Sequence, residues 1–400
     1  MKIGIVGYFN PYAVFGYFSE ESKSKVRSVN ETATAVNVLV KSFLNAGHQV
    51  VVFTGDHNAY EDTTLNGKQI TVHVVGFKIR HRYLHFFILS EYSKKIRQCI
   101  LKNLEGVEIL HAQWTYHFAD ACCSFTDKVP IVCTARDWAP YVYSTVSGVK
   151  AKLLWLQKKW MSRRVLNHSK IHFVSNSYYT QQRIFSVHPD YEVPIIFNSI
   201  EDSYILRERD NYPQHNTFIS ISPEVDDHRK NCDVLIEAFS LFLHYFPGAR
   251  LLMIGKVDFA GNLYQKWKKQ NWLINVEFPG YVDHARLMEL FDEVTCLVHP
   301  SLEETFGNIL LEGMARRVPV IGGEKSGAVP FVLKQGKCGC LCDITNPESI
   351  MNAMMKIVTD KSYASSLVNN GTTVLLEEYS GSVVEQKHMQ FYESIINSYL

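Results

Sequence analysis

Several features that would place this chain in a specialised class of proteins are missing. No apolar run reaches the ~18 residues that a membrane-spanning helix needs, and the apolar stretch YLHFFILS at 83–90 is far too short. The first residues, MKIGIVGYFNPY, lack a signal-peptide pattern and begin directly with a buried-strand pattern. Lysine and arginine number 41 against 40 acidic residues, so there is no basic excess for nucleic acid. We therefore expect a cytoplasmic protein that binds no nucleic acid.

Disulfide and metal patterns are absent as well. The nine cysteines are odd in number and irregularly spaced, which is typical of reduced thiols. At period two, the side chains of Cys338, Cys340 and Cys342 fall on one face of a short strand. A zinc cluster is the alternative interpretation, but zinc sites favour gaps of roughly two to four residues between cysteines. The sixteen histidines are scattered, and we predict no metal site.

The chain does contain a long alternation of short apolar runs and helical stretches. At 400 residues it is too long for one ordinary core, so two domains are expected. In the first half, buried strands are indicated at 2–8, 49–55, 70–77, 107–113, 130–137, 170–176 and 192–198. Helices are expected at 30–48, with Asn30 as N-cap and Gly47 as C-cap, at 90–104 and at 150–168.

The polar, strand-poor stretch at 201–216 indicates a connection between domains. A second series of strands follows it, at 217–223, 249–256, 276–282, 296–301, 318–323 and 339–344. Helices are expected between these strands, at 231–247, 283–294, 307–317 and 347–358. The last segment, 382–400, has the pattern of an amphipathic helix. This alternation predicts an α/β protein with two doubly wound parallel sheets that bind ligands at the C-terminal ends of their strands.

One segment, HPSLEETFGNILLEGMARRVPVIGG, places Glu304 and Glu312 eight residues apart around a glycine. If a helix starts near Phe306, its free N–H groups favour an anion, and Gly307 lets a phosphate approach closely. The two carboxylates would repel phosphate but accept hydrogen bonds from hydroxyls. A nucleoside-diphosphate sugar has this order of groups: ribose, two phosphates and a hexose. The alternative is a pair of ordinary acidic residues near a helix start.

This segment resembles the E-x7-E motif of the retaining GT-B glycosyltransferases, the group 1 or family 4-like glycosyltransferases. Four further segments match in the right order: GHQVVVFT, NSI at 198–200, HRKNCDVLIEAF, and FPGYVDHARLMELFDEVTCLVHPS. The resemblance implies two Rossmann-like parallel-sheet domains facing each other across a cleft. Residues 1–200 would form the acceptor side and 201–381 the donor domain. The helix at 382–400 would cross back to the first domain.

The resemblance also implies roles for individual residues. Glu312 would hold the ribose hydroxyls, and Glu304 would contact hydroxyls of the donor sugar. Lys230 would neutralise the leaving diphosphate. Tyr281 would either line the base site or simply pack against its neighbours. Backbone N–H groups would be presented to the sugar-diphosphate by Phe306, Gly307 and Asn308.

Three departures from the family pattern concern charged groups and glycines. The Gly-Arg pair expected before the lysine is missing, and Arg229 is the candidate to replace the arginine. The first loop, glycine-rich in the family, offers only Gly16. Where the family often has His-Asp, TARDWAP places Arg136, which can bind phosphate in a bidentate manner. Near the end of the strand at 107–113, His111 and His117 are each either catalytic or structural.

The resemblance implies transfer of a hexose from a nucleotide sugar to a glycan or lipid-linked acceptor with retention of configuration. This would occur by front-face attack, without a protein nucleophile, a cofactor or a metal, in bacterial surface polysaccharide or lipopolysaccharide biosynthesis. Two other functions stay open. A nicotinamide-dependent dehydrogenase would need G-x-G-x-x-G, which IGIVGYFNPY matches poorly. A nucleotide-sugar-binding protein without turnover would be consistent with the missing arginine and the altered first loop.

The segment at 150–164, KAKLLWLQKKWMSRR, carries six basic residues and no acidic one among leucines and tryptophans. It resembles a helix that lies on anionic lipid, which would suit an enzyme at the inner face of the cytoplasmic membrane. The alternative is a domain helix with a solvated basic face. Peripheral membrane contact is therefore one of two interpretations of this segment.

Overall fold

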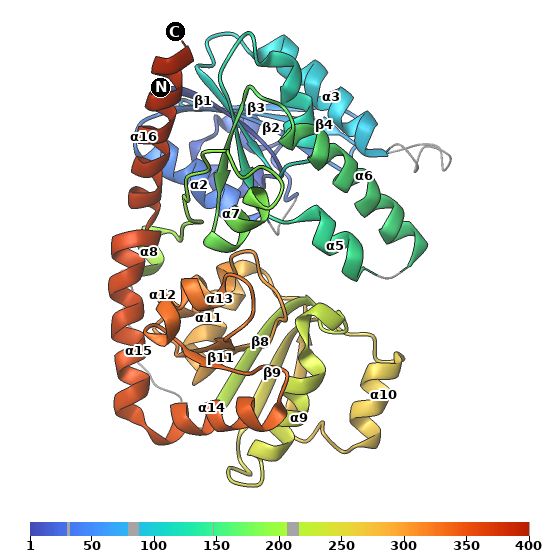
Figure 1. The fold of residues 1–400 in the computed structure, drawn as a ribbon, viewed down its shortest axis with the longest axis vertical. Helices are drawn as coiled ribbons and strands as arrows, with labels where there is room; N and C mark the ends of the chain where they lie inside the picture. Colours follow the sequence, from blue (N-terminus) through green and yellow to red (C-terminus); the bar gives the residue numbers. More distant parts are fainter. Residues whose placement is uncertain (30–32, 79–87, 147, 206–215, 400) are drawn as a thin grey trace. The chain divides into compact units, whose positions relative to one another are not determined.

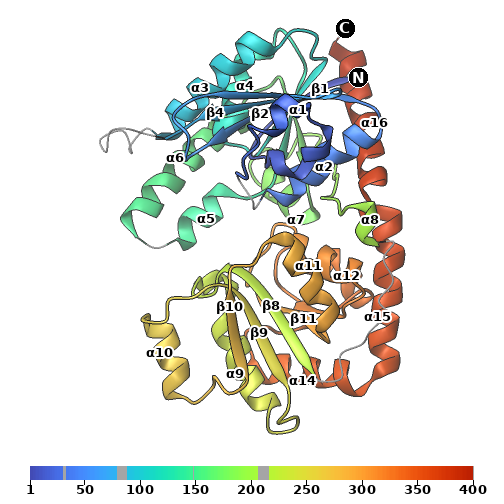
Figure 2. The ribbon, with the colours of Figure 1, turned by 180° about the vertical axis from the view of Figure 1, so that it is seen from behind.

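The computed structural model describes residues 1–29, 33–78, 88–146, 148–205 and 216–399. The chain divides into two compact units. Unit 1 comprises Met1–Ser199 together with Gly381–Leu400, and unit 2 comprises Ile200–Ser380. Each unit has its own sheet, with helices packed on it (Figure 1, Figure 2). Within the described ranges, no helix combines the length and apolarity needed to cross a bilayer.

The sheet of unit 1 is mostly parallel. Its strands are β1 (Lys2–Val6), β2 (Gln49–Asp56), β3 (Thr63–Asn66), β4 (Ile70–Gly76), β5 (Ile109–Gln113), β6 (Ile131–Ala135) and β7 (Ile171–Ser175). Their spatial order is β3-β4-β2-β1-β5-β6-β7, and only the β3–β4 pair is antiparallel. The strand order reverses between β1 and β5, which makes this a doubly wound sheet.

The helices of unit 1 connect these strands and cover the sheet. They are η1 (Pro11–Tyr17), α1 (Glu20–Lys23), α2 (Thr34–Asn45), α3 (Ile88–Asn103), α4 (His117–Cys122), η3 (Cys123–Phe125), α5 (Ala139–Thr145), α6 (Val149–Leu166), α7 (Tyr178–Phe185) and α16 (Gly381–Tyr399). Gly47 follows α2 with φ of 87°, as expected for a glycine that ends a helix. The expected N-cap, Asn30, lies outside the described residues.

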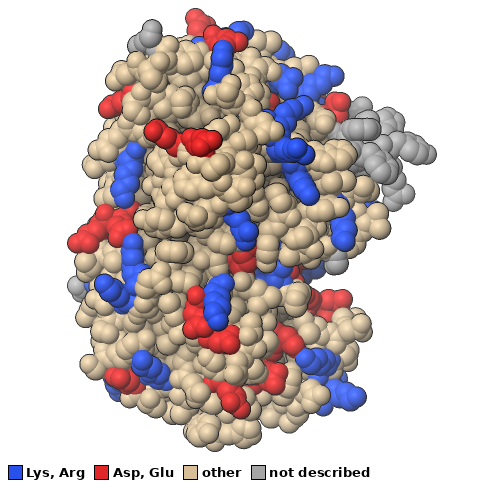
Figure 3. All heavy atoms as spheres, in the orientation of Figure 1, with Lys and Arg blue, Asp and Glu red and all other residues tan. Residues whose placement is uncertain are grey.

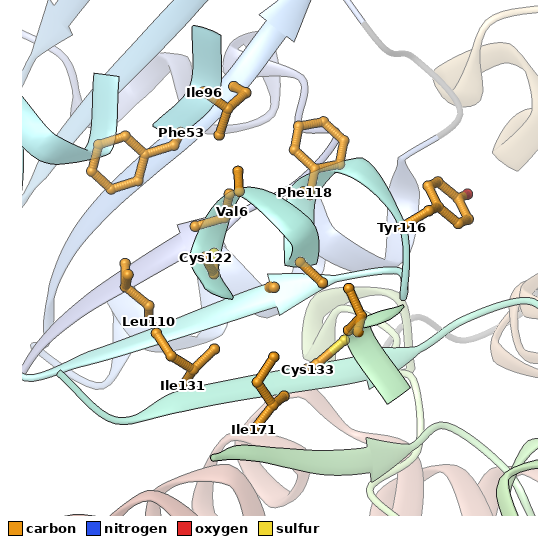
Figure 4. Packing of buried hydrophobic residues seen from close by; sticks show 14 of the residues in the cluster. Val6, Phe53, Ile96, Leu110, Tyr116, Phe118, Cys122, Ile131, Cys133 and Ile171 are labelled. Atoms are coloured by element: carbon orange, nitrogen blue, oxygen red, sulfur yellow. The ribbon is translucent and has the colours of Figure 1, made fainter. Parts of the chain in front are cut away.

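Period-two alternation along the strands divides the core of unit 1 into two layers. On one face, Val6 and Phe53 pack with side chains of α3, α4 and α6, among them Ile96 (Figure 4). On the other face, their chain neighbours Ile5 and Val52 pack with side chains of α2 and α16. Both layers are needed because a parallel sheet is buried on both faces. Complete burial of one such side chain contributes roughly 1.5–3 kcal/mol.

A buried polar contact also ties α16 to the sheet of unit 1. The Tyr392 hydroxyl lies 2.6 Å from His111 Nδ1, and the Thr134 hydroxyl lies 2.6 Å from His111 Nε2. His111 and Tyr392 are both fully buried. Burial, with repulsion from His388 and Arg136, holds the pKa of His111 well below its ordinary value. The ring is therefore neutral and serves as a bridge between β5, β6 and α16.

Unit 2 carries a second sheet, which is entirely parallel. Its strands are β8 (Thr217–Glu224), β9 (Arg250–Lys256), β10 (Val276–Gly280), β11 (Cys296–His299), β12 (Val320–Gly323) and β13 (Cys340–Cys342). Their order is β10-β9-β8-β11-β12-β13, so the reversal falls between β8 and β11. On one face of this sheet, Phe218, Met253 and Ile321 form a buried cluster with side chains of the helices at 232–242 and 347–359.

The helices of unit 2 include several short ones. They are α8 (Asp202–Ile205), η4 (His228–Lys230), α9 (Cys232–Phe242), α10 (Asn262–Lys269), α11 (His284–Glu293), α12 (Asn308–Ala315), α13 (Val329–Val332), η5 (Lys334–Gly336), α14 (Pro347–Thr359), α15 (Lys361–Val374) and the π-helical turn η6 (Leu375–Tyr379). Of the connection expected at 201–216, the structure describes 201–205, which contain α8, and Asn216, whereas residues 206–215 lie outside the described ranges.

The predicted α/β class with two parallel sheets is confirmed, and one predicted strand is wrong. Within 192–198, the structure has an isolated bridge from Ile195 to Ser175, at the end of β7, in place of a strand. Pro194 lacks the N–H that a continuous ladder needs there. The structure adds β3, whose polar sequence TTLN gives no apolar run and buries only Leu65.

We expect Tyr392→Phe to destabilise unit 1. The substitution keeps the ring but leaves a nitrogen of the buried His111 without its hydroxyl partner, which costs about 1–3 kcal/mol. Chemical denaturation measures the change in the free energy of unfolding. Tyr12→Phe is the matched control because that side chain is 62% exposed. We expect the control to stay within about 0.5 kcal/mol of the wild type. Equal stability of the two variants would show that the Tyr392 hydroxyl does not anchor α16.

Candidate functional site

Two loops meet at the carboxyl edge of the sheet of unit 2. One follows β8 and leads through η4 to α9, and the other follows β11 and leads to α12. Because β8 and β11 are neighbours at the point where the strand order reverses, both loops lie where doubly wound sheets bind ligands. The Leu302 N–H donates to the Arg229 carbonyl at 2.9 Å and ties the two loops together.

Glu304, in the second loop, is held by two nitrogen groups. Lys230 Nζ, from the first loop, lies 2.6 Å from Glu304 Oε1. His299 Nε2, at the end of β11, lies 3.2 Å from the same oxygen. Burial would raise the pKa of Glu304, but Lys230 and His299 outweigh it and hold that pKa well below its usual range. The Glu304 carboxylate is therefore ionised throughout the physiological pH range.

The backbone of Glu304 is fixed by a neighbouring glycine. Glu304 and Gly327 form an isolated parallel bridge, and the Ala328 N–H donates to the Glu304 carbonyl at 2.9 Å. Gly327 has φ of 60°, and a Cβ added there would lie 2.4 Å from the Glu304 carbonyl oxygen. Only glycine allows this approach, so the position of Glu304 depends on residue 327.

The helix predicted to start near Phe306 begins two residues later, at Asn308. Gly307 is its N-cap and has φ of 87°, a conformation that glycine adopts readily and other residues avoid. The need for a glycine here comes from this turn, and an added Cβ would also lie 3.0 Å from the Leu310 side chain. Phe306 as a whole is 1% exposed, and its ring packs edge-on against Tyr379 at 5.9 Å. A contact of its backbone N–H with a ligand stays a prediction.

Glu312 lies inside α12, and its side chain is 8% exposed. His284, the first residue of α11, places Nε2 3.5 Å from Glu312 Oε1. This hydrogen bond raises the pKa of His284 above its ordinary value. The ring of Tyr204, in α8, lies 5.8 Å from that of His284, and burial raises the pKa of Tyr204 to about 12. Three helices therefore converge at Glu312.

Two further predicted residues of unit 2 lie beside this group. The Arg229 guanidinium donates from Nη2 to Asp227 Oδ2 at 2.6 Å and from Nε to Asp227 Oδ1 at 3.1 Å. The Arg229 guanidinium is therefore paired with Asp227, whereas Lys230 is the residue that pairs with Glu304. Tyr281 follows β10, is 61% exposed, and precedes His284 by three residues. A role of Tyr281 in base binding stays a prediction.

The remaining predicted residues belong to unit 1. Arg136 donates from Nε to Gln113 Oε1 and from Nη1 to Asn198 Oδ1, both at 2.6 Å. Burial lowers the pKa of Arg136 to about 10, so the group is still a cation at neutral pH. Because His111 is fully buried and bridges two hydroxyls, the structure favours a structural role over the predicted catalytic one. Gly16 lies in η1, where an added Cβ would meet open space.

The carboxyl edge of the sheet of unit 1 brings together residues that the sequence did not single out. Asp137, directly after Arg136, accepts a hydrogen bond from the Tyr116 hydroxyl at 3.0 Å. Burial raises the pKa of Asp137, although Lys158 and the Tyr116 hydroxyl act against this. Lys158 Nζ, from α6, lies 4.6 Å from the centre of the Tyr116 ring. His117, the other candidate histidine, is fully buried beside Tyr116.

The sequence also failed to indicate His299 and His284, the two histidines that contact the glutamates of unit 2. His299 is the last residue of β11, and residues at the ends of parallel strands often line a binding site. That position was a usable signal. His284 follows the helix cap Asp283, and its approach to Glu312 depends on how α11 packs on α12. No short-range pattern predicts that contact.

Chemically, the group in unit 2 combines hydroxyl acceptors with positive charge. Glu304 and Glu312 accept hydrogen bonds from alcohols, while Lys230 and the start of α12 attract an anion. In the part of the chain that the structure describes, no group of three or more His, Cys, Asp or Glu side chains could hold a metal ion.

Two known protein families match the chain. The family described as glycosyl transferases group 1 matches residues 207–374, and glycosyltransferase family 4 matches residues 32–203. The chain belongs to the group 1 glycosyltransferases. The group 1 match contains the two glutamates and Lys230, and the family 4 match contains Arg136.

Relatives of this glycosyltransferase include proteins of archaea and bacteria. An uncharacterized glycosyltransferase of Methanocaldococcus jannaschii is 22% identical over 393 residues, which cover 92% of this chain and 95% of the relative. The lipopolysaccharide core biosynthesis glycosyltransferase LpsE of Rhizobium meliloti is 28% identical over 42% of this chain and 47% of its own length.

Solved structures show the fold of this glycosyltransferase. Sucrose-phosphate synthase from Thermosynechococcus elongatus matches over 100% of both chains, with a TM-score of 0.74 and 17% identity. Anabaena HepE in complex with UDP matches 98% of this chain and 100% of its own, with a TM-score of 0.64 and 14% identity. These similarities confirm the predicted GT-B class.

We expect Gly327→Ala to displace the loop of this glycosyltransferase that carries Glu304. Placing alanine at positive φ costs roughly 1–2 kcal/mol, and the clash with the Glu304 carbonyl adds to this. The melting temperature should fall, and hydrogen exchange at the Ala328 amide should accelerate because its bond to Glu304 weakens. Gly248→Ala is the matched control, since an added Cβ there meets nothing within 4 Å. Unchanged exchange at Ala328 in the Gly327 variant would contradict this account of the loop.

Proposed function

We propose that this glycosyltransferase moves a hexose from a nucleoside-diphosphate sugar to a glycan or lipid-linked acceptor and retains the anomeric configuration. The observation that carries the donor class is the grouping in unit 2. There, Lys230 and the start of α12 supply positive charge beside two carboxylates, Glu304 and Glu312. Hydroxyls at both ends of a diphosphate would satisfy this set of groups.

In this proposal, each part of the donor has a partner. Glu312 accepts hydrogen bonds from the ribose hydroxyls, and Glu304 accepts one from a hydroxyl of the sugar. The diphosphate lies against Gly307 and the N–H of Asn308, near Lys230. Four residues of helix separate Asn308 from Glu312, a rise of about 6 Å, which is comparable with the reach from a ribose to its phosphates. Tyr281, at the exposed end of β10, is the candidate for contact with the base.

The proposed reaction needs no protein nucleophile. The acceptor oxygen bonds to the anomeric carbon on the face from which the diphosphate departs, and the bond from that carbon to the phosphate oxygen breaks. The acceptor proton passes to the departing diphosphate. Lys230 stabilises the charge that develops on this leaving group, a contribution of about 10²–10³ in rate. Resemblance to the E-x7-E glycosyltransferases supports retention.

The acceptor is proposed to bind unit 1. Arg136 and Asp137 follow β6 at the carboxyl edge of its sheet, and Tyr116 and Lys158 lie beside Asp137. An arginine can bind a phosphate of a lipid-linked acceptor, and a carboxylate can orient a sugar hydroxyl. The relative from Rhizobium meliloti is named for lipopolysaccharide core biosynthesis. We propose a related setting, bacterial surface polysaccharide assembly, for this chain.

We also propose that α6 contacts an anionic membrane. Val149 and Trp160 are 77% and 65% exposed, and Lys150 and Lys152 are exposed beside them. Lys and Arg side chains gather over this part of unit 1 in Figure 3. Lys158 points the other way, toward the rings of Trp155 and Tyr116. Apolar and basic side chains exposed on one helix suit the interface of an anionic bilayer.

A thermal-shift panel of UDP-, GDP- and ADP-sugars tests the donor class. We expect one nucleotide class to raise the melting temperature, since a ligand at 100 times its Kd stabilises by about 2.7 kcal/mol. Nicotinamide cofactors should have no effect. Glu312→Gln should weaken the shift, whereas Glu289→Gln, on the exposed surface of α11, should preserve it. If no nucleotide sugar shifts the wild type, the donor proposal is wrong.

The nucleotide sugar that raises the melting temperature in this panel can also distinguish an enzyme from a binding protein. With the selected donor and a mixture of lipid-linked and free glycan acceptors, we expect release of the nucleoside diphosphate and a product with the donor's anomeric configuration. Nuclear magnetic resonance of the product gives that configuration. Binding without release of nucleoside diphosphate would favour the binding protein without turnover.

Charge reversal tests the membrane proposal. We expect Lys150→Glu with Lys152→Glu to reduce sedimentation with vesicles that contain phosphatidylglycerol. Each lysine near such a surface contributes about 1 kcal/mol, so the partition should fall at least roughly 10-fold. The control is Lys268→Glu with Lys269→Glu on α10, which is also basic and exposed. Equal losses in the two variants would indicate that net charge, rather than α6, governs binding.

A further inference from the structure

His299 is placed by the sheet rather than by a loop. It is the last residue of β11 and pairs in register with Gly322 of β12. It is 3% exposed, so its ring cannot turn freely into solvent. An imidazole has only two rotatable side-chain bonds, and here both are confined by packing. The direction of its Nε2 is therefore set by the strand, and Nε2 lies 3.2 Å from Glu304 Oε1.

Lys230 and His299 share one oxygen of the carboxylate. Among the described residues, both partners of the Glu304 side chain bind Oε1, Lys230 at 2.6 Å and His299 at 3.2 Å. The second oxygen, Oε2, is hydrogen-bonded to neither of them and can accept a further hydrogen bond. A carboxylate oxygen has lone pairs only, so the group that it takes is a donor such as a hydroxyl.

Lys230 and His299 differ in how they can act once a nucleotide sugar is bound. Lys230 has a long flexible side chain whose compact charge is attracted to any diphosphate nearby. An ammonium that turns toward phosphate weakens its hold on Glu304. His299 has no such freedom, because it is buried at the end of a strand. It can therefore hold the carboxylate in place while Lys230 serves the phosphates.

We propose that His299 is a positioning residue that fixes Glu304 Oε2 toward a hydroxyl of the donor sugar, so that the site discriminates a nucleotide sugar from the bare nucleotide. This inference rests on the proposed function, since it assumes that the sugar lies at Glu304. A neutral imidazole with its proton on Nε2 is sufficient, because such a nitrogen donates to the carboxylate. His299 itself touches neither sugar nor phosphate.

Two substitutions separate positioning from packing. His299→Leu fills a similar space without a donor, and His299→Gln offers an amide N–H in place of Nε2–H. Binding of the nucleoside diphosphate alone and of the matching nucleotide sugar is measured by calorimetry for both variants and the wild type. In His299→Leu, we expect the affinity for the nucleotide sugar and the turnover number to fall about 10- to 100-fold, the usual cost of a displaced site group. The Kd of the bare nucleotide should stay within about twofold of the wild-type value, and His299→Gln should recover most of the loss.

Each outcome decides whether His299 positions Glu304 or only packs against its neighbours. Unchanged discrimination in His299→Leu would overturn the proposal, and so would a parallel loss of bare-nucleotide and sugar-nucleotide binding, which indicates a purely structural residue. The contact itself is tested without ligand, by nitrogen-15 resonances of labelled histidine in the full chain. A slowly exchanging Nε2 proton on His299 that is perturbed in Glu304→Gln supports the hydrogen bond, and its absence contradicts it. If the wild type binds no nucleotide sugar, the proposed function fails, while these resonances still judge the His299–Glu304 contact.

Discussion

The ion pair between Lys230 and Glu304 is the contact on which the arrangement of unit 2 depends. It joins the loop after β8 to the loop after β11, across 74 residues of sequence, at the point where the strand order reverses. A partly buried pair of this kind gains little net stability, because desolvation offsets most of the attraction. Its main effect is positional. It keeps a carboxylate ionised and oriented at the edge of the sheet, beside the start of α12.

The backbone around this pair is as specific as the charges. Gly307 and Gly327 both have positive φ, one at the start of α12 and one beneath the Glu304 carbonyl. A side chain at either position would strain the loop and shift the acid. Gly307 makes the turn that starts α12, and a Cβ there would meet the Leu310 side chain. The sequence suggested room for a ligand at this glycine, which stays a prediction, and did not indicate the turn.

Much of the fold was predictable because parallel strands are buried on both faces and appear as continuous apolar runs. The same rule misassigned 192–198, which is apolar but contains Pro194 and forms only a bridge to Ser175. The sequence also indicated Glu304, Glu312 and Lys230, because their segments resemble those of a known family. The sequence could not indicate that the Tyr392 hydroxyl would contact His111, because 281 residues separate the two and no local pattern predicts that contact. The contact of His284 with Glu312 was hidden for the same reason.

The helix α16 completes the core of unit 1 with Val384, Tyr392 and Ile395, although it is made after all of unit 2. On the ribosome, the first unit therefore emerges with one face of its sheet only partly covered by α2. Domains made first usually fold first during synthesis. Here the apolar surface that α16 covers stays exposed until α16 has been made. Unit 1 is thus started before unit 2 but completed only by a helix that is made after it.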